Sequence, residues 1–86
     1  MNKFNLTITS PDGNVFSGEA IYLRLRGTEG ELAVMAGHAP FVTGIVPCEV
    51  KIELESGVKL GSVDGGLLSV AKDSVTLASG SFKWKK

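Results

Sequence analysis

The segment from Arg26 to Thr43 holds most of the side chains that could do chemistry in this 86-residue chain. It contains the only histidine, His38, and the carboxylates Glu29 and Glu31, together with three glycines and a His-Ala-Pro turn. This mixture is typical of neither a plain strand nor a helix, because glycine admits unusual backbone angles and proline lacks an N–H donor. We therefore expect a constrained loop here, and a loop with a fixed shape more often serves contact than stability.

The residue types near this loop offer little catalytic chemistry. Nucleophilic catalysis needs a base beside the nucleophile, and His38 is the only ordinary candidate, without a nameable partner. A metal site needs several converging ligands, whereas the chain has one histidine and one cysteine, Cys48, ten positions apart. No glycine-rich phosphate loop with its lysine is present. We expect no catalytic residue, no metal and no cofactor, and we interpret His38 as a turn or contact residue.

The elements that must position these residues are short strands. Apolar and polar side chains alternate along several runs, and strict alternation places one set on a buried face and the other in solvent. Arg24 and Glu53 lie between apolar positions, so they are expected to be solvated. The positions expected to face inward are Phe4, Leu6, Ile8, Ile21, Leu23, Leu25, Val50, Ile52, Leu54, Val75, Leu77, Phe82 and Trp84.

Turn residues separate these runs at regular intervals. Pro11-Asp12-Gly13 is a strong turn by residue chemistry, and similar signals recur along the chain. Adjacent glycines at Gly65 and Gly66 predict a bulge or the close approach of another backbone. No segment of helical length shows apolar residues at helical spacing. The pattern predicts an all-β antiparallel sandwich or barrel of eight to ten strands, with residues 1–86 as one domain.

Composition excludes several classes of function. Nine basic and nine acidic residues leave a formal net charge of zero, so the electrostatic footprint of a nucleic-acid-binding protein is absent. A single cysteine cannot form an internal disulfide, and no run has the length of a signal peptide core or a membrane span. We expect a cytoplasmic protein that meets a membrane only through other proteins.

Four segments in a fixed order resemble a known family. They are Ser10–Gly13 followed by Phe16–Gly18, then Gly27–Leu32, Gly37–Pro40 and Gly65–Gly66. Their order and spacing are similar to those of the N-terminal domain of the epsilon subunit of F-type rotary ATP synthases. The resemblance covers essentially the whole chain. It implies a flattened antiparallel β-sandwich of about ten short strands.

The resemblance also implies a role in the central stalk of the synthase. The family's sandwich is a non-catalytic subunit that binds gamma, rests on the ring of c subunits and couples proton-driven rotation to ATP synthesis. Carried over to this chain, Glu31 and His38 are expected to contact the c-ring, and Ser10, Val42 and Thr43 are expected to lie near gamma. The expected location is the cytoplasmic face of a bacterial cell membrane, reached as a peripheral part of the complex.

The chain departs from the family pattern in three places. Residues Ala33–Ala36 stand where many members have Gly-Val-Leu-Pro, which relaxes the entry to the loop, and Cys48 replaces a common glycine after proline. The sequence also stops after Trp84-Lys85-Lys86, without the two C-terminal helices of most epsilon subunits. Either the short form is natural or the helices were removed. In both cases we expect no ATP binding and no inhibition by an extended helical arm.

Two other functions remain open from the residues alone. A free-standing β-sandwich that binds a peptide or saccharide would need an exposed aromatic patch, and Tyr22, Phe41 and Trp84 are scattered along the sequence. A small hydrolase built around His38 would need a nucleophile or metal partner that cannot be named.

Overall fold

The computed structural model describes residues 2–37 and 39–85, which form ten strands and no helix. The all-β prediction is therefore confirmed for these residues, and none of them belongs to a helix that could cross a membrane. The strands are β1 (Phe4–Ser10), β2 (Gly13–Ala20), β3 (Tyr22–Gly27), β4 (Gly30–Met35), β5 (Phe41–Ile45), β6 (Cys48–Leu54), β7 (Gly57–Val63), β8 (Gly66–Val70), β9 (Ser74–Ala78) and β10 (Phe82–Trp84).

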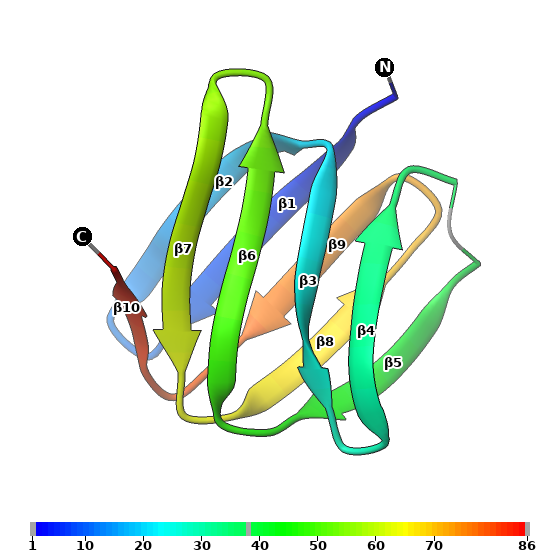
Figure 1. The fold of residues 1–86 in the computed structure, drawn as a ribbon. Coiled ribbons are helices and arrows are strands. Elements are labelled where there is room, and N and C mark those ends of the chain that lie inside the picture. The colour runs from blue at the N-terminus through cyan, green and yellow to red at the C-terminus, as the bar shows by residue number, and fades with distance from the viewer. Residues whose placement is uncertain (1, 38, 86) are drawn as a thin grey trace.

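The strands form two packed layers. Hydrogen-bonded neighbours follow the order β10-β7-β6-β3-β5-β8-β9-β1-β2, and β4 pairs with β3. Strand β3 joins the layers because its last residue, Gly27, pairs with Ile45 of β5. Figure 1 shows β7, β6, β3 and β4 in front and β2, β1, β9, β8 and β5 crossing behind them. The domain measures 30 × 28 × 22 Å, which agrees with a flattened sandwich.

One pairing departs from an antiparallel arrangement. Strands β1 and β9 run parallel from the pair Asn5–Ser74 to the pair Thr9–Ala78, while the other paired strands of the described chain are antiparallel. The sequence pattern could not reveal this difference, because alternation is the same in parallel and antiparallel strands.

The core lies between the two layers and follows the predicted alternation. Leu6, Ile8, Leu23, Ile52 and Leu77 are among its fully buried side chains. Some predicted inward residues are less enclosed: Ile21, Leu54 and Phe82 are half-buried and Trp84 is 37% exposed. These positions lie near strand ends or on the short terminal strand β10, where the second layer covers them incompletely.

The prediction of a continuous loop from Arg26 to Thr43 is wrong. Most of this segment is strand, since β4 spans Gly30–Met35 and β5 begins at Phe41. Val34 is buried and Leu32 half-buried, so the segment does alternate. Small residues and flanking glycines hid that alternation in the sequence.

The predicted close backbone approach at Gly65-Gly66 is confirmed. A Cβ atom built on Gly66 would lie 2.2 Å from the carbonyl oxygen of Ala78, which no side chain tolerates. Glycine at this position therefore lets β8 lie against β9 where the β7–β8 turn enters the sheet.

Candidate functional site

Glu31 lies on a tight hairpin rather than in a loop. The pair Gly27–Gly30 closes a two-residue turn between β3 and β4, and Gly30 has a φ of +123°, which favours glycine. Glu31 follows at once on β4, directly opposite Arg26 of β3. Its side chain points outward, because the neighbouring Leu32 faces the core cluster.

The Glu31 carboxylate already has a partner within the chain. Arg24 of β3 donates a hydrogen bond of 2.6 Å from Nη2 to Oε1 of Glu31, and both side chains are about half exposed. This hydrogen bond, and then the charge of the guanidinium, lower the pKa of Glu31 below its ordinary value. The same contact raises the pKa of Arg24. Glu31 is thus held as a carboxylate in a defined orientation.

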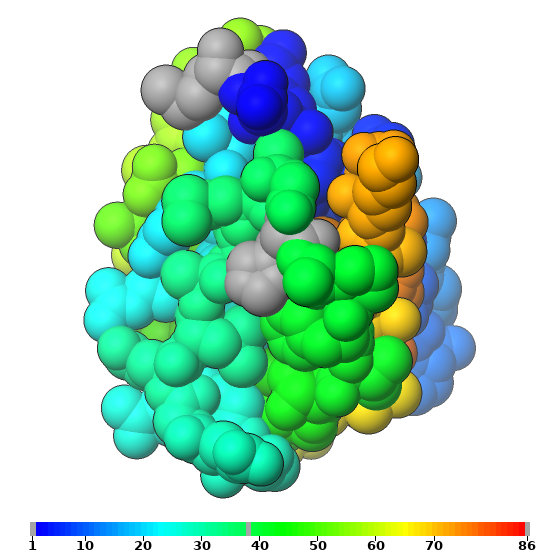
Figure 2. Space-filling view, turned by 90° about the vertical axis from the view of Figure 1, so that its right-hand side faces the viewer, coloured from blue at the N-terminus to red at the C-terminus, as the bar shows by residue number. Residues whose placement is uncertain are grey.

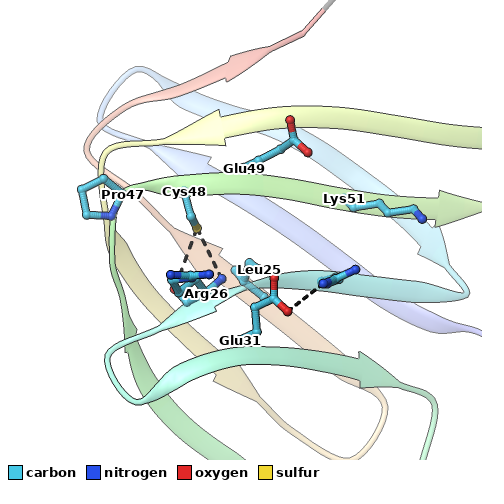
Figure 3. A pocket seen from close by; sticks show the side chains of 8 residues that line it. Leu25, Arg26, Glu31, Pro47, Cys48, Glu49 and Lys51 are labelled. Carbon is cyan, nitrogen blue, oxygen red and sulfur yellow. Dashed lines mark hydrogen bonds and ion pairs between the residues drawn. The ribbon is translucent and has the colours of Figure 1, made fainter.

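A surface pocket of about 450 Å³ lies beside this ion pair. Figure 3 shows its lining side chains, with Glu31 on one strand and Cys48, Glu49 and Lys51 on another. We call the outer side of β4, β3 and β6 the charged face. Its charged residues are Arg24, Arg26, Glu31, Glu49, Lys51 and Glu53.

Of the two residues expected to contact the c-ring, the structure describes Glu31, near the beginning of β4. The connection between β4 and β5 leaves β4 at the end opposite Glu31, as Figure 1 shows. Figure 2 shows β4 and β5 side by side on this edge of the molecule. Because β4 has six residues, its two ends lie roughly 17 Å apart. His38 belongs to that connection but lies outside the described residues, so its expected contact stays a prediction.

The three residues expected near gamma all lie on the second layer. Ser10 ends β1 and accepts a hydrogen bond of 3.3 Å at its hydroxyl from the backbone N–H of Asp12. Val42 on β5 points outward and is 64% exposed. Thr43 pairs with buried Leu68, so it lies on the inner side of the layer and is half-buried. Strands β8 and β9 separate β5 from β1, so Ser10 lies apart from the other two.

The outer side of this second layer carries no charge on four adjacent strands. Register pairs Val42 with Ser69, Ser69 with Thr76, and Thr76 with Thr7, so these side chains form one row across the layer. We call this surface the uncharged face. Its residues are Asn5, Thr7 and Thr9 of β1, Val42 and Gly44 of β5, Leu67 and Ser69 of β8, and Ser74, Thr76 and Ala78 of β9.

Sequence reasoning missed the uncharged face, although a signal for it exists. The outward positions of β1, β5, β8 and β9 are serine, threonine, alanine, asparagine, glycine, valine and leucine, whereas those of β3 and β6 are mostly charged. Leu67 is 51% exposed on this face. Comparing the polar partners within each alternating run would have separated the two groups. It would not have shown that β1 adjoins β9.

The structure also describes other residues considered for metal binding, thiol chemistry or aromatic recognition. No group of three or more histidine, cysteine, aspartate or glutamate side chains that could hold a metal occurs among the described residues. Cys48 is half-buried, and its Sγ accepts a hydrogen bond of 3.4 Å from the backbone N–H of Arg26. Trp84 packs edge-on against Phe16 and Phe82, with ring centroids 6.0 and 4.8 Å away. The Trp84 ring therefore packs within the edge of the sandwich.

Known proteins are similar to this chain in sequence and in fold. The family model of the β-sandwich domain of the ATP synthase delta/epsilon chain matches residues 3–85. An ATP synthase epsilon chain from Ruminococcus albus is 33% identical over 85 residues, which are 98% of this chain and 63% of that relative.

Two solved structures contain similar domains. One is the OSCP/F1/c-ring assembly of Euglena gracilis mitochondrial ATP synthase, where a chain matches 95% of this one with a TM-score of 0.89 and 25% identity. Another is the central stalk/c-ring of Tetrahymena thermophila mitochondrial ATP synthase, with a TM-score of 0.80, 94% coverage and 16% identity, a likeness of fold. The present chain spans 53% and 66% of those two chains, and 63% of the Ruminococcus relative.

Proposed function

Because the chain belongs to the family of ATP synthase delta/epsilon β-sandwich domains, we propose that it serves as a non-catalytic part of the central stalk of an F-type ATP synthase. In this role it binds the gamma subunit and the c-ring and helps couple proton-driven rotation to ATP synthesis. It meets the cytoplasmic face of a bacterial cell membrane through the complex. The observation that carries this proposal is the division of the domain into an uncharged face and a charged face.

The uncharged face is the proposed surface for gamma. The cores of protein interfaces are depleted in charged residues, and burying an unpaired charge is costly. Val42 and Leu67 lie exposed here, in a setting of short uncharged side chains. Such a surface can be covered by another protein without leaving a charge unpaired. Val42 lies on this face, and Thr43 and Ser10 lie on the strands that carry it.

The charged face and its hairpin are the proposed surface for the c-ring. Glu31 presents a carboxylate next to a tight turn, where a polar loop of a neighbouring protein can approach. Exposed ion pairs contribute only about 0–1 kcal/mol each, so the gamma interface must supply most of the attachment. His38, which follows β4 in the sequence, is retained as a second proposed ring contact.

A binding experiment with a charge substitution tests the gamma surface. The chain is mixed with purified gamma, and complex formation is followed by size-exclusion chromatography and by calorimetry. Thr76→Lys places a charge in the middle of the uncharged face and is expected to weaken binding at least about tenfold. Ser62→Lys is the matched control, because Ser62 lies between Glu49 and Lys83 on the other layer.

Three outcomes distinguish the possibilities. Loss of binding in Thr76→Lys with retention in Ser62→Lys supports the proposed face. Equal binding by both variants shows that gamma uses another surface. If the unmodified chain binds neither gamma nor the c-ring, the stalk function is wrong, and a free-standing peptide- or saccharide-binding module takes its place.

A further inference from the structure

We infer that Arg24 is the positioning residue for the Glu31 contact: its guanidinium holds the carboxylate on the outer side of β4 and leaves the second oxygen to a hydrogen-bond donor of the docking protein. This inference rests on the proposed function, in which Glu31 meets the c-ring. The partner group it fits is a donor, such as a lysine, an arginine or a side-chain amide.

The geometry selects Arg24 over a closer candidate. By backbone register Glu31 lies directly opposite Arg26, while Arg24 lies opposite Ala33. The ion pair is nevertheless the diagonal one, with Arg24 Nη2 2.6 Å from Glu31 Oε1. Diagonal partners on adjacent strands are within reach of long side chains, and the short Ala33 leaves the Arg24 guanidinium free to lean toward Glu31.

The described contacts of Glu31 engage one of its two oxygens. Oε1 accepts the hydrogen bond from Arg24, and no described residue donates to Oε2. A carboxylate accepts several hydrogen bonds, so Oε2 retains acceptor capacity. Because Glu31 is about half exposed, a donor from another protein can reach this oxygen.

The two arginines of β3 favour the ionised form of Glu31. Strand β3 contributes Arg24 and Arg26, and β6 contributes Lys51 and Glu49 to the same pocket, while Glu29 lies in the adjoining turn. The pKa of Glu31 is lowered first by the hydrogen bond from Arg24, and Arg26 adds a weaker attraction. The ion pair between Glu31 and Arg24 therefore persists as pH falls through the ordinary range of glutamate. It is lost only as pH falls through the lowered pKa of Glu31.

A titration of the chain alone tests the positioning role without any partner. The carboxyl resonance of Glu31 is followed by NMR against pH in the unmodified chain, Arg24→Gln and Arg26→Gln. The Arg24→Gln change is expected to move the midpoint up toward that of an ordinary glutamate. Arg26→Gln removes the same charge from the position opposite Glu31 and is expected to move it less. If the Glu31 midpoint shifts equally in both variants, the shift reflects the loss of any nearby positive charge and not the specific hydrogen bond from Arg24. That result would overturn the inference.

A double-mutant cycle tests the docking role. Binding of the chain–gamma complex to detergent-solubilised c-ring is measured for Glu31→Gln, Arg24→Gln and the double variant. Each single change is expected to weaken binding by roughly threefold to tenfold, and the double variant should bind no more weakly than either. Arg24→Lys, which keeps a donor, should recover part of the loss. Thermal unfolding checks that all variants remain folded.

The two possible failures are separable. If Glu31→Gln binds the ring as tightly as the unmodified chain, the proposed ring contact is wrong and the docking role of Arg24 falls with it. If Glu31→Gln weakens binding while Arg24→Gln does not, the ring contact stands and the positioning role of Arg24 is wrong.

Discussion

At the scale of the residue, Ser79 shows how a buried polar group can hold two connections together. It is the buried polar side chain of the described core, with 6% exposure. Its hydroxyl lies 2.6 Å from the carbonyl oxygen of Gly65 and accepts a hydrogen bond of 3.3 Å from the backbone N–H of Ser81. The Oδ1 atom of Asp64 lies 3.4 Å away. Ser79 thereby ties the β7–β8 turn to the β9–β10 connection.

Removing this hydroxyl should destabilise the fold. Ser79→Ala leaves the Gly65 carbonyl and the Ser81 N–H without their partner in a largely buried setting. The free energy of unfolding is expected to fall by about 1–3 kcal/mol, measured by urea denaturation. Ser69→Ala, at an exposed outward position, is the matched control and should change stability by no more than about 0.5 kcal/mol. Equal effects of the two changes would contradict the role given to Ser79.

At the scale of the element, the pairing of β8 with β9 depends on the absence of a side chain at Gly66. The carbonyl oxygen of Ala78 occupies the place where a Cβ atom would stand, at 2.2 Å. Backbone at such a distance cannot move aside without breaking the ladder that carries Leu68 opposite Leu77. The two strands also carry Leu67, Ser69, Thr76 and Ala78 of the uncharged face, so this steric requirement shapes the proposed gamma surface.

A methyl group at Gly66 should therefore be poorly tolerated. Gly66→Ala is expected to lower the free energy of unfolding by at least about 2 kcal/mol, because the backbone of β8 must shift away from β9. Gly80→Ala is the control: its Cβ would lie 3.8 Å from the Asp64 carboxylate, an ordinary contact. That change should alter stability by less than about 1 kcal/mol. A Gly66→Ala variant as stable as the unmodified chain would show that the strands relax without cost.

At the scale of the whole molecule, one core is shared by two layers whose outer sides differ in chemistry. Strand β10 pairs with β7 on the layer of the charged face, yet Trp84 of β10 packs against Phe16 of β2 on the other layer. Lys59 places its ammonium 4.9 Å from the centre of the Trp84 ring. The tryptophan thus closes one edge of the sandwich, where β2 and β10 meet.

Trp84 should report the unfolding of the entire domain. It is the only tryptophan in the chain, so its fluorescence measures the closure between the layers. Because both layers bury their apolar side chains in one cluster, neither is expected to remain folded alone. Urea transitions followed by Trp84 fluorescence and by far-ultraviolet circular dichroism should coincide. An earlier fluorescence transition would show that the β10 edge opens independently.

Much of the fold could be predicted from local sequence, but the candidate site less so. Alternation identified the runs of β1, β3, β6 and β9, because a strand must turn alternate side chains toward the core. It failed for β4, where glycine and alanine weaken the contrast between the two faces. The prediction was least accurate for Glu31. It was expected in a loop, whereas it lies on β4 and forms an ion pair with Arg24.

The sequence by itself determined which side chains of the clearly alternating runs face the core and where most turns lie, because these depend on residues close together along the chain. It also indicated the family, through the order and spacing of four segments. Only the tertiary structure decided which strands place their outward-facing side chains next to each other. The parallel pairing of β1 with β9 joins Thr7 to Thr76 and extends the uncharged face, and the β3–β4 register sets Arg24 beside Glu31. Such neighbours are chosen by how the two layers fold over a common core, which no local pattern encodes.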